Sequence, residues 1–200
     1  MNQLRIALLF SALALVSAAA DAQQTNVRVR GTITAFDGNV ISVKSREGED
    51  LKIKLADNAA VTTVKALSLA DIKPGDAVGS SAVQRDGKLT ALEVHVFPAS
   101  RAIPNEGHRP WDLLPGSTMT NATVSAIVQG SSGRELTLKY KDGSQKILVP
   151  QTTPIVTAVP ADRSLLVPGE YVFLVADVGA DGKMTASRIQ VSKDGIKPPQ

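Results

Sequence analysis

The side chains of this chain that could hold a metal ion lie in one proline-rich segment, residues 98–121. It contains His108 and Met119, an imidazole and a thioether, which are ligand types that suit cuprous ion. Trp111 lies between them in the sequence, and an indole ring can cap such an ion by a cation–π contact. Two soft ligands make a weak metal site, so the segment predicts at most a site for monovalent copper or silver.

The large apolar side chains of the same segment support a competing, structural interpretation. Trp111, Leu113 and Leu114 would be costly to leave in water, since burying each of them fully is worth roughly 1.5 to 3 kcal/mol. Large apolar residues are usually buried. We therefore expect these three to cover the end of a barrel or the seam between two barrels.

A second kind of candidate site is a basic surface. If the first predicted strands form a continuous sheet, their outward positions carry six cationic side chains, namely Arg28, Arg30, Lys44, Arg46, Lys52 and Lys54. Such a face could hold a phosphate-bearing lipid or another anionic ligand through salt-sensitive contacts. Glu47, Glu49 and Asp50 dilute its charge, so an ordinary solvated face is the competing interpretation.

The composition argues against most enzyme classes. The 200 residues contain no cysteine, which excludes disulfides, thiol catalysis and zinc–thiolate sites, and they contain only two histidines. No G-x-S-x-G motif is present, so we predict no catalytic residues and no enzymatic activity. A calcium loop starting at Asp177 fails because its twelfth position is Arg188, where a bidentate carboxylate is required. A net charge of +3 is also too weak a bias to announce a polyanion partner.

The elements that must position these residues are strands. Apolar and polar residues alternate along residues 27–33, 41–44 and 51–55, which is typical of half-buried strands. Asp-Gly pairs separate such runs, and this dipeptide supplies the positive φ angles of tight hairpins. In the first half of the chain only residues 67–72 are helix-like, and a helix there cannot continue through Pro74-Gly75.

The chain contains two copies of one unit. The run D-G-K-L-T-A at 86–91 recurs as D-G-K-M-T-A at 181–186, and K-P-G-D at 73–76 recurs as V-P-G-E at 167–170. A nearly constant offset of this kind indicates a duplicated unit. Each copy predicts three strands, a short helix and two more strands, which is the element order of an OB-like barrel. We therefore predict an all-β protein of two tandem five-stranded OB-like barrels, each with a short helix between strands three and four.

The remaining histidine, His95, is expected to face solvent. It aligns with Gln190 of the second copy, and alternation places it on the opposite face from Val94 and Val96. The metal hypothesis therefore depends on His108.

The predicted organisation is sequential. A first barrel at residues 23–97, a connector at 98–120, a second barrel at 121–195 and a tail at 196–200 follow a signal peptide at residues 1–22. The signal peptide is indicated by a short basic start, an unbroken apolar run and the small-x-small sequence Ala20-Asp21-Ala22. We expect cleavage near Ala22-Gln23, a periplasmic or secreted mature protein, and no transmembrane span in the mature chain.

The turn and core motifs of the two copies are V-x-G-x-I-x-x-F, D-G-N-V-I-S-V, L-x-L-x-D-I-K-P-G-D and D-G-K-L-T-A-x-E-V. They resemble an uncharacterised bacterial family of exported small β-barrel domains, a domain of unknown function, over most of residues 27–97 and 121–193. The second copy departs from the pattern at residues 130–134. A more distant likeness is to the periplasmic OB-barrel copper chaperones, which share the strand order but place histidine before a W-P-x-M-x-M run.

Together these observations predict an exported, non-enzymatic binding or interaction module of the bacterial periplasm. The alternative is a periplasmic metal-handling protein that binds copper or silver through the connector residues. The expected partner is an envelope protein or an anionic envelope ligand, and the expected oligomeric state is a monomer or weak oligomer. Nucleic acid is not an expected partner, because the strands lack the aromatic stacking platforms that single strands need. No cofactor is expected apart from a possible monovalent copper ion.

Overall fold

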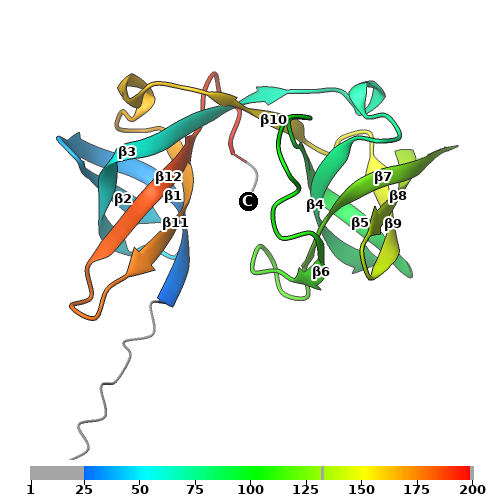
Figure 1. Ribbon diagram of the computed structural model, residues 1–200, viewed down its shortest axis with the longest axis horizontal. Helices are drawn as coiled ribbons and strands as arrows, with labels where there is room; N and C mark the ends of the chain where they lie inside the picture. The colour runs from blue at the N-terminus through cyan, green and yellow to red at the C-terminus, as the bar shows by residue number, and fades with distance from the viewer. Residues whose placement is uncertain (1–24, 132, 199–200) are drawn as a thin grey trace, which may run out of the picture.

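A computed structural model describes residues 25–131 and 133–198, so the predicted signal peptide lies outside the described residues. The prediction of an all-β fold is confirmed (Figure 1). The strands are β1 (Thr25–Asp37), β2 (Val40–Ser45), β3 (Asp50–Ala66), β4 (Ala77–Arg85), β5 (Lys88–Val96), β6 (Gly107–Pro110), β7 (Thr118–Gly130), β8 (Gly133–Tyr140), β9 (Gly143–Pro150), β10 (Ile155–Pro160), β11 (Tyr171–Val178) and β12 (Met184–Val191). No helix within the described ranges is long and apolar enough to cross a membrane.

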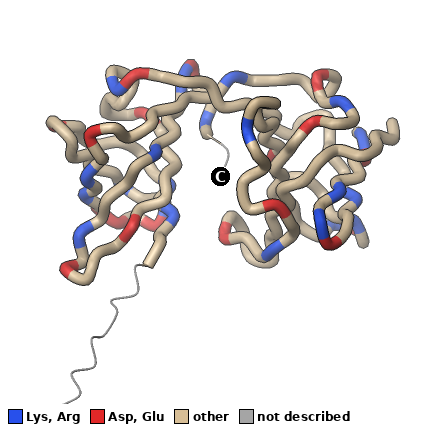
Figure 2. Tube along the Cα trace, viewed as in Figure 1, with Lys and Arg blue, Asp and Glu red and all other residues tan. Residues whose placement is uncertain are grey.

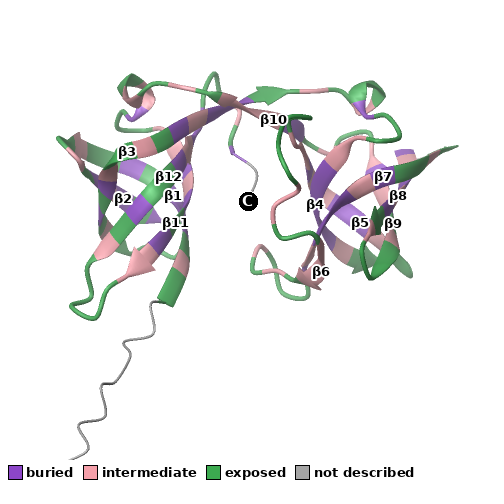
Figure 3. Cartoon of the chain, viewed as in Figure 1, coloured by how far each residue is buried: buried purple, intermediate pink, exposed green. Residues whose placement is uncertain are grey.

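Five strands close into a barrel, which we call the first barrel: β1, β2, β3, β12 and β11. β1 pairs with β2 and β11, and β3 pairs with β2 and β12, so the ring has no free edge. The predicted alternation points one side of each strand inward, and Val29, Ile41, Ile53 and Leu174 are each at most 2% exposed in its core. Figure 3 shows these buried positions alternating with exposed ones along the strands.

Strands are exchanged between the two predicted copies, so the predicted sequential boundaries are wrong. β11 and β12 of the second copy complete the first barrel, while β4 and β5 of the first copy pair with β7 and β9. The physical cause lies in β3, a strand of 17 residues without glycine or proline. Its run of β-branched residues, Val61 to Val64, favours extended backbone and carries the chain out of the first barrel instead of turning it back.

The remaining strands form a second set: β4, β5, β7, β8 and β9, with β6 added alongside β7. β5 and β9 pair over two residues, which joins the two ends of this set. It has its own core, in which Val78, Val94, Leu138 and Ile147 are fully buried. Each of the two cores is therefore built from both copies of the repeat.

A short bridge of two strands connects the first barrel to the second set. The end of β3 runs antiparallel to β10 over five residue pairs, and β10 also pairs in parallel with β5. Figure 1 shows this bridge at the top of the molecule, between the two groups of strands.

The connector also differs from its prediction. It follows β5 and leads into β7, and both strands belong to the second set. Residues 98–117 thus form a long loop that begins and ends in the second set, and they do not link two barrels. The links that carry the chain between the first barrel and the second set are residues 67–76 and 161–170.

The helix predicted at residues 67–72 is reduced to a single 3-10 turn, Leu69–Asp71, with a matching turn at Arg163–Leu165 in the second copy. The Ser68 amide and hydroxyl both donate to one Asp71 carboxylate oxygen at 2.7 Å. The carboxylate of Asp71, the last residue of the turn, thus caps the backbone that enters it, and Pro74-Gly75 stops any further helix.

The strand exchange predicts which engineered cysteines will form a disulfide. Asn26 of β1 lies directly opposite Asp177 of β11. Directly opposed residues of an antiparallel pair bring their Cβ atoms close enough for a disulfide. Mild oxidation of the N26C/D177C variant should therefore cross-link it nearly completely, as read by electrophoretic mobility without reductant.

The matched control pairs Asn26 with the position in the first copy that corresponds to Asp177, which is Val83. A sequential barrel would place these two residues side by side, whereas the exchanged fold places β4 in the second set. Because the natural chain has no cysteine, any disulfide is the engineered one. Cross-linking of N26C/V83C in place of N26C/D177C would contradict the exchanged topology.

Candidate functional site

Three arginines of the first barrel lie together, and we call them the arginine cluster: Arg28, Arg30 and Arg46. Arg28 and Arg30 are two residues apart on β1, so their side chains leave the strand on the same face, opposite the core residue Val29. Arg46 follows β2 directly, and its amide donates to the Arg30 carbonyl at 2.8 Å. This backbone contact holds the third guanidinium beside the other two.

The partner of the arginine cluster is a loop of the connector, residues 111–117. The Trp111 amide donates to the Ser117 carbonyl at 2.8 Å. The Ser117 hydroxyl donates to the Trp111 carbonyl at 3.0 Å and accepts from the Leu114 amide at 3.1 Å. These bonds close the loop on itself around a buried serine, so that Trp111 and Asp112 are presented as a pre-formed pair.

Asp112 forms a bidentate ion pair with Arg30. The two guanidinium nitrogens of Arg30 donate to the two carboxylate oxygens at 2.8 and 3.1 Å, and Arg28 adds a longer contact of 3.5 Å. The Arg30 side chain is 2% exposed and the Asp112 side chain is 44% exposed, so the carboxylate reaches a buried cation from outside. Partial burial raises the pKa of Asp112, but the hydrogen bond and charge of Arg30 and the charge of Arg28 outweigh it, and the net pKa lies below its ordinary value.

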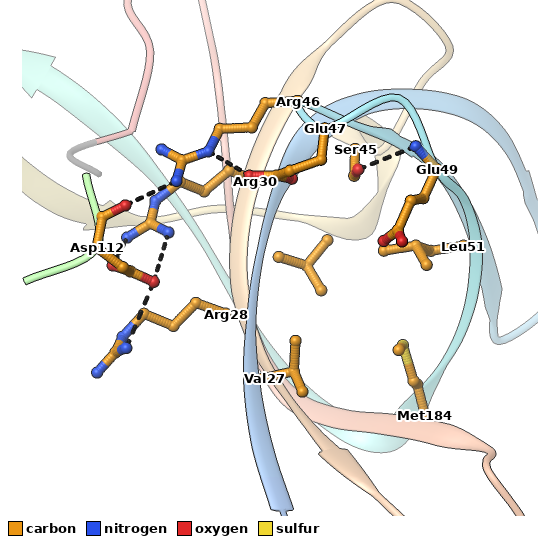
Figure 4. A pocket seen from close by; sticks show the side chains of 11 residues that line it. Val27, Arg28, Arg30, Ser45, Arg46, Glu47, Glu49, Leu51, Asp112 and Met184 are labelled. Carbon is orange, nitrogen blue, oxygen red and sulfur yellow. Dashed lines mark hydrogen bonds and ion pairs between the residues drawn. The ribbon is translucent and has the colours of Figure 1, made fainter. Parts of the chain in front are cut away.

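Arg46 binds the main chain of the same loop. One of its guanidinium nitrogens donates to the Asp112 carbonyl at 2.7 Å and another to the Leu113 carbonyl at 3.3 Å, while its Nε donates to Glu47 at 2.5 Å. Figure 4 shows these side chains converging on Asp112 from one side of β1. The arginine cluster therefore contacts both a side chain and the backbone of the loop.

Trp111 lies among guanidinium groups in the seam between the first barrel and the connector. Its ring centroid is 4.2 Å from the Arg28 guanidinium carbon, 5.7 Å from that of Arg30 and 5.6 Å from that of Arg109. Stacked arginines of this kind contribute by cation–π attraction. Leu114 does not share this environment and remains 46% exposed, in contrast to the burial expected from the sequence.

A pocket of about 220 Å³ lies next to the arginine cluster, and its lining residues are Val27, Arg28, Val29, Arg30, Ser45, Arg46, Glu47, Glu49, Leu51, Asp112 and Met184. Figure 4 shows the arginines on one side of β1 and Val27, Leu51 and Met184 on the other, at the mouth of the first barrel. The lining thus combines charged groups toward the connector with an apolar floor. These side chains offer charged and hydrogen-bonding groups to a molecule in the pocket.

The predicted metal ligands are not brought together. His108 lies opposite Thr120 in the β6–β7 ladder and its Nδ1 is hydrogen-bonded to the Thr120 hydroxyl at 2.8 Å, whereas Met119 lies opposite Arg109. Adjacent residues of a strand point to opposite faces, which separates His108 from Met119. Trp111 is surrounded by guanidinium groups, which would repel a metal cation. Within the described ranges, no group of three or more histidine, aspartate or glutamate side chains could hold a metal ion.

His95 does not face solvent as expected. β10 pairs with β5 at this position, with His95 aligned with Val156, so His95 lies on a strand that has a neighbour on both edges. Burial, with a contribution from the Arg101 charge, lowers the pKa of His95 to about 4. Its Nε2 is buried without a hydrogen-bond partner, and its ring lies 4.9 Å from that of Phe97.

The three predicted lysines stay apart from the arginine cluster. Lys44 forms an exposed ion pair with Asp50 at 3.1 Å, and Lys52 and Lys54 are exposed on β3, which β2 separates from β1. Figure 2 shows the Lys and Arg positions spread over both groups of strands, with Asp and Glu positions among them. Because the strands curve around a closed barrel, their outward side chains point in different directions. The assumption of one continuous flat sheet therefore overestimates how many basic side chains share one surface. The sequence did not predict Asp112, whose ion pairs are with Arg28 and Arg30 of the distant strand β1, or Arg109, which lies near the Trp111 ring.

The ion pair of Asp112 should contribute measurably to stability. In the Asp112→Asn variant the buried Arg30 loses its bidentate acceptor, and we expect a loss of about 1 to 3 kcal/mol in the free energy of unfolding. The lower half of this range is favoured because the carboxylate is partly exposed and screened. Urea unfolding followed by the fluorescence of Trp111, the single tryptophan, measures it.

The matched control is Asp50→Asn, which breaks the exposed Lys44–Asp50 pair and should change stability by less than about 1 kcal/mol. Equal effects of the two substitutions at neutral pH would show that the arginine cluster does not hold the loop.

The contribution of Asp112 to the free energy of unfolding should also depend on pH. Because the folded pKa of Asp112 is depressed, this contribution is present above the ordinary value of 3.8 and is lost as the pH falls through the folded pKa.

No family model, curated protein or solved structure matches the chain.

Proposed function

We propose that the chain is an exported, non-enzymatic interaction module of the bacterial periplasm, built from two OB-like barrels, and that its first barrel engages an anionic partner. The observation that carries this proposal is the convergence of Arg28, Arg30 and Arg46 on one acidic, aromatic loop. A fold that uses three guanidiniums to hold one loop has, at that place, a surface chemically suited to acidic groups.

The OB-like part of the proposal is supported by the strand order. The first barrel takes three consecutive strands, β1 to β3, and closes them with a pair of strands that follows a 3-10 turn, β11 and β12. In the second set β7 to β9 are joined in the same way to β4 and β5. The element order of an OB-like barrel is thereby kept, although the closing pair comes from the other copy.

The non-enzymatic part is supported by the state of the two histidines. The pKa of His95 is lowered to about 4 by burial, and His108 is hydrogen-bonded to Thr120. Neither lies beside the pocket next to the arginine cluster, whose lining includes Ser45 without an imidazole to activate it.

Binding to anionic probes tests the proposal. The protein is mixed with phosphatidylglycerol vesicles, with phosphatidylcholine vesicles and with poly-glutamate, at about 20 mM and about 500 mM salt. We expect binding to at least one anionic probe, no binding to phosphatidylcholine, and a steep loss of binding at high salt, because exposed charge contacts are screened. Co-sedimentation and fluorescence anisotropy give the readouts.

Charge removal locates the surface responsible. Lys52 and Lys54 are exposed on the first barrel outside the arginine cluster, and each lysine near an anionic membrane is worth about 1 kcal/mol, so the loss of two in K52Q/K54Q should weaken vesicle binding roughly thirtyfold. The control K139Q/K141Q removes two exposed charges from the second set and should have a much smaller effect. Absence of salt-sensitive binding to every anionic probe would overturn the proposed function.

A further inference from the structure

The 111–117 loop is held by the first barrel in the way that a bound peptide is held by a receptor. Arg46 donates to two consecutive main-chain carbonyls, those of Asp112 and Leu113. Arg30 forms a two-pronged contact with the Asp112 carboxylate. In peptide-binding sites, main-chain hydrogen bonds provide affinity and side-chain contacts provide specificity, and both kinds of contact are present here.

The aromatic residue that precedes the aspartate is recognised as well. The Arg28 guanidinium stacks on the Trp111 ring at 4.2 Å and also approaches the Asp112 carboxylate at 3.5 Å. One arginine thus contacts the ring and the acid together. The feature that the arginine cluster matches is therefore an aromatic residue followed directly by an acidic one.

The 111–117 loop is connected to the second set through the chain, but its binding partners are residues of the first barrel. It is part of the long loop between β5 and β7, so its chain ends belong to the second set, and its tip is exposed at Leu114, Pro115 and Gly116. The receptor side keeps unused binding capacity, because Arg30 is 2% exposed and its Nε is buried without a hydrogen-bond partner. A buried guanidinium that is incompletely satisfied favours an additional or better-placed acceptor.

We propose that the arginine cluster is a binding site for an acidic peptide segment of a partner protein, with an aromatic residue followed by aspartate or glutamate, and that the 111–117 loop occupies this site in the free protein. The inference rests on the proposed function and names the class of partner. The pocket beside the cluster, with Val27, Leu51 and Met184 on its apolar side, gives room for further side chains of the segment.

The tethered loop sets the conditions of the test. A segment of the same chain competes at an effective concentration of about millimolar, so a free peptide binds the natural protein weakly. Removing the anchors of the loop frees the site. The variant W111A/D112N removes both anchors and also the single tryptophan of the chain, so that the tryptophan of an added peptide reports its own binding.

The probe is a synthetic peptide with the sequence of residues 110–117, P-W-D-L-L-P-G-S. We expect it to bind W111A/D112N at least about tenfold more tightly than it binds the natural protein, measured by isothermal titration calorimetry and, for the variant, by the peptide's fluorescence. A peptide with asparagine in place of aspartate should bind at least about tenfold more weakly, because it lacks the bidentate acceptor for Arg30. Adding R28A and R46A to the variant should abolish binding.

The D112N variant alone, with a dye-labelled peptide and anisotropy as readout, repeats the test in a protein that keeps Trp111 and its packing. Failure of both variants to bind at about millimolar peptide, equal binding of the asparagine peptide, or binding that survives loss of Arg28 and Arg46 would each overturn the inference. Binding of phosphatidylglycerol vesicles without binding of the peptide would also overturn it, and would leave the proposed function standing with a lipid as the partner.

Discussion

The arrangement of the whole molecule depends on one uninterrupted strand, β3. Its 17 residues pair with β2 at one end and with β10 at the other, and no glycine or proline allows it to turn between them. Backbone groups in a strand must find partners along its full length, so the chain is carried past the edge of the first barrel. In the second copy the corresponding segment is divided into β9 and β10, and Pro154 lies between them. β9 pairs with β8, whereas β10 pairs with β3. The exchange of the closing strand pairs follows from this geometry.

The exchange couples the two cores. Val29 and Ile53 of the first copy pack with Leu174 and Ile189 of the second, while Val94 of the first copy packs in the core that contains Leu138. Each core contains apolar side chains from both halves of the chain. Folding of the first barrel's core therefore requires contacts between residues more than a hundred positions apart, such as Val29 and Leu174, and a long-range topology of this kind folds slowly compared with local hairpins.

The sequence predicted what depends on local pattern and missed what depends on distant contacts. Alternation and Asp-Gly turns predicted the strands and their faces, because a period of two is a property of a short segment. The partner of each strand was not predictable, since corresponding strands of the two copies carry nearly the same pattern and either could close a given barrel. The same limit applies to the site: alternation placed Arg28 and Arg30 on one outward face, but nothing near them in the sequence announces Asp112. The burial of His95 was not predictable from alternation either, because alternation does not show that β10, from a distant part of the chain, pairs with β5 at this position.

The seam between the loop and the arginine cluster combines stability with access. A fully enclosed ion pair would be hard to displace, and an ion pair exposed on both sides would contribute little. Here the cation, Arg30, is buried among Trp111 and Phe173, and the anion, Asp112, enters from solvent. The buried partner makes any departure of the carboxylate unfavourable unless another acceptor replaces it, and the exposed partner gives that acceptor a route of approach. An external acidic segment can bind only the fraction of molecules in which the loop has left the arginine cluster, and its apparent affinity is reduced by that fraction. The loop is therefore an intramolecular competitor for the arginine cluster.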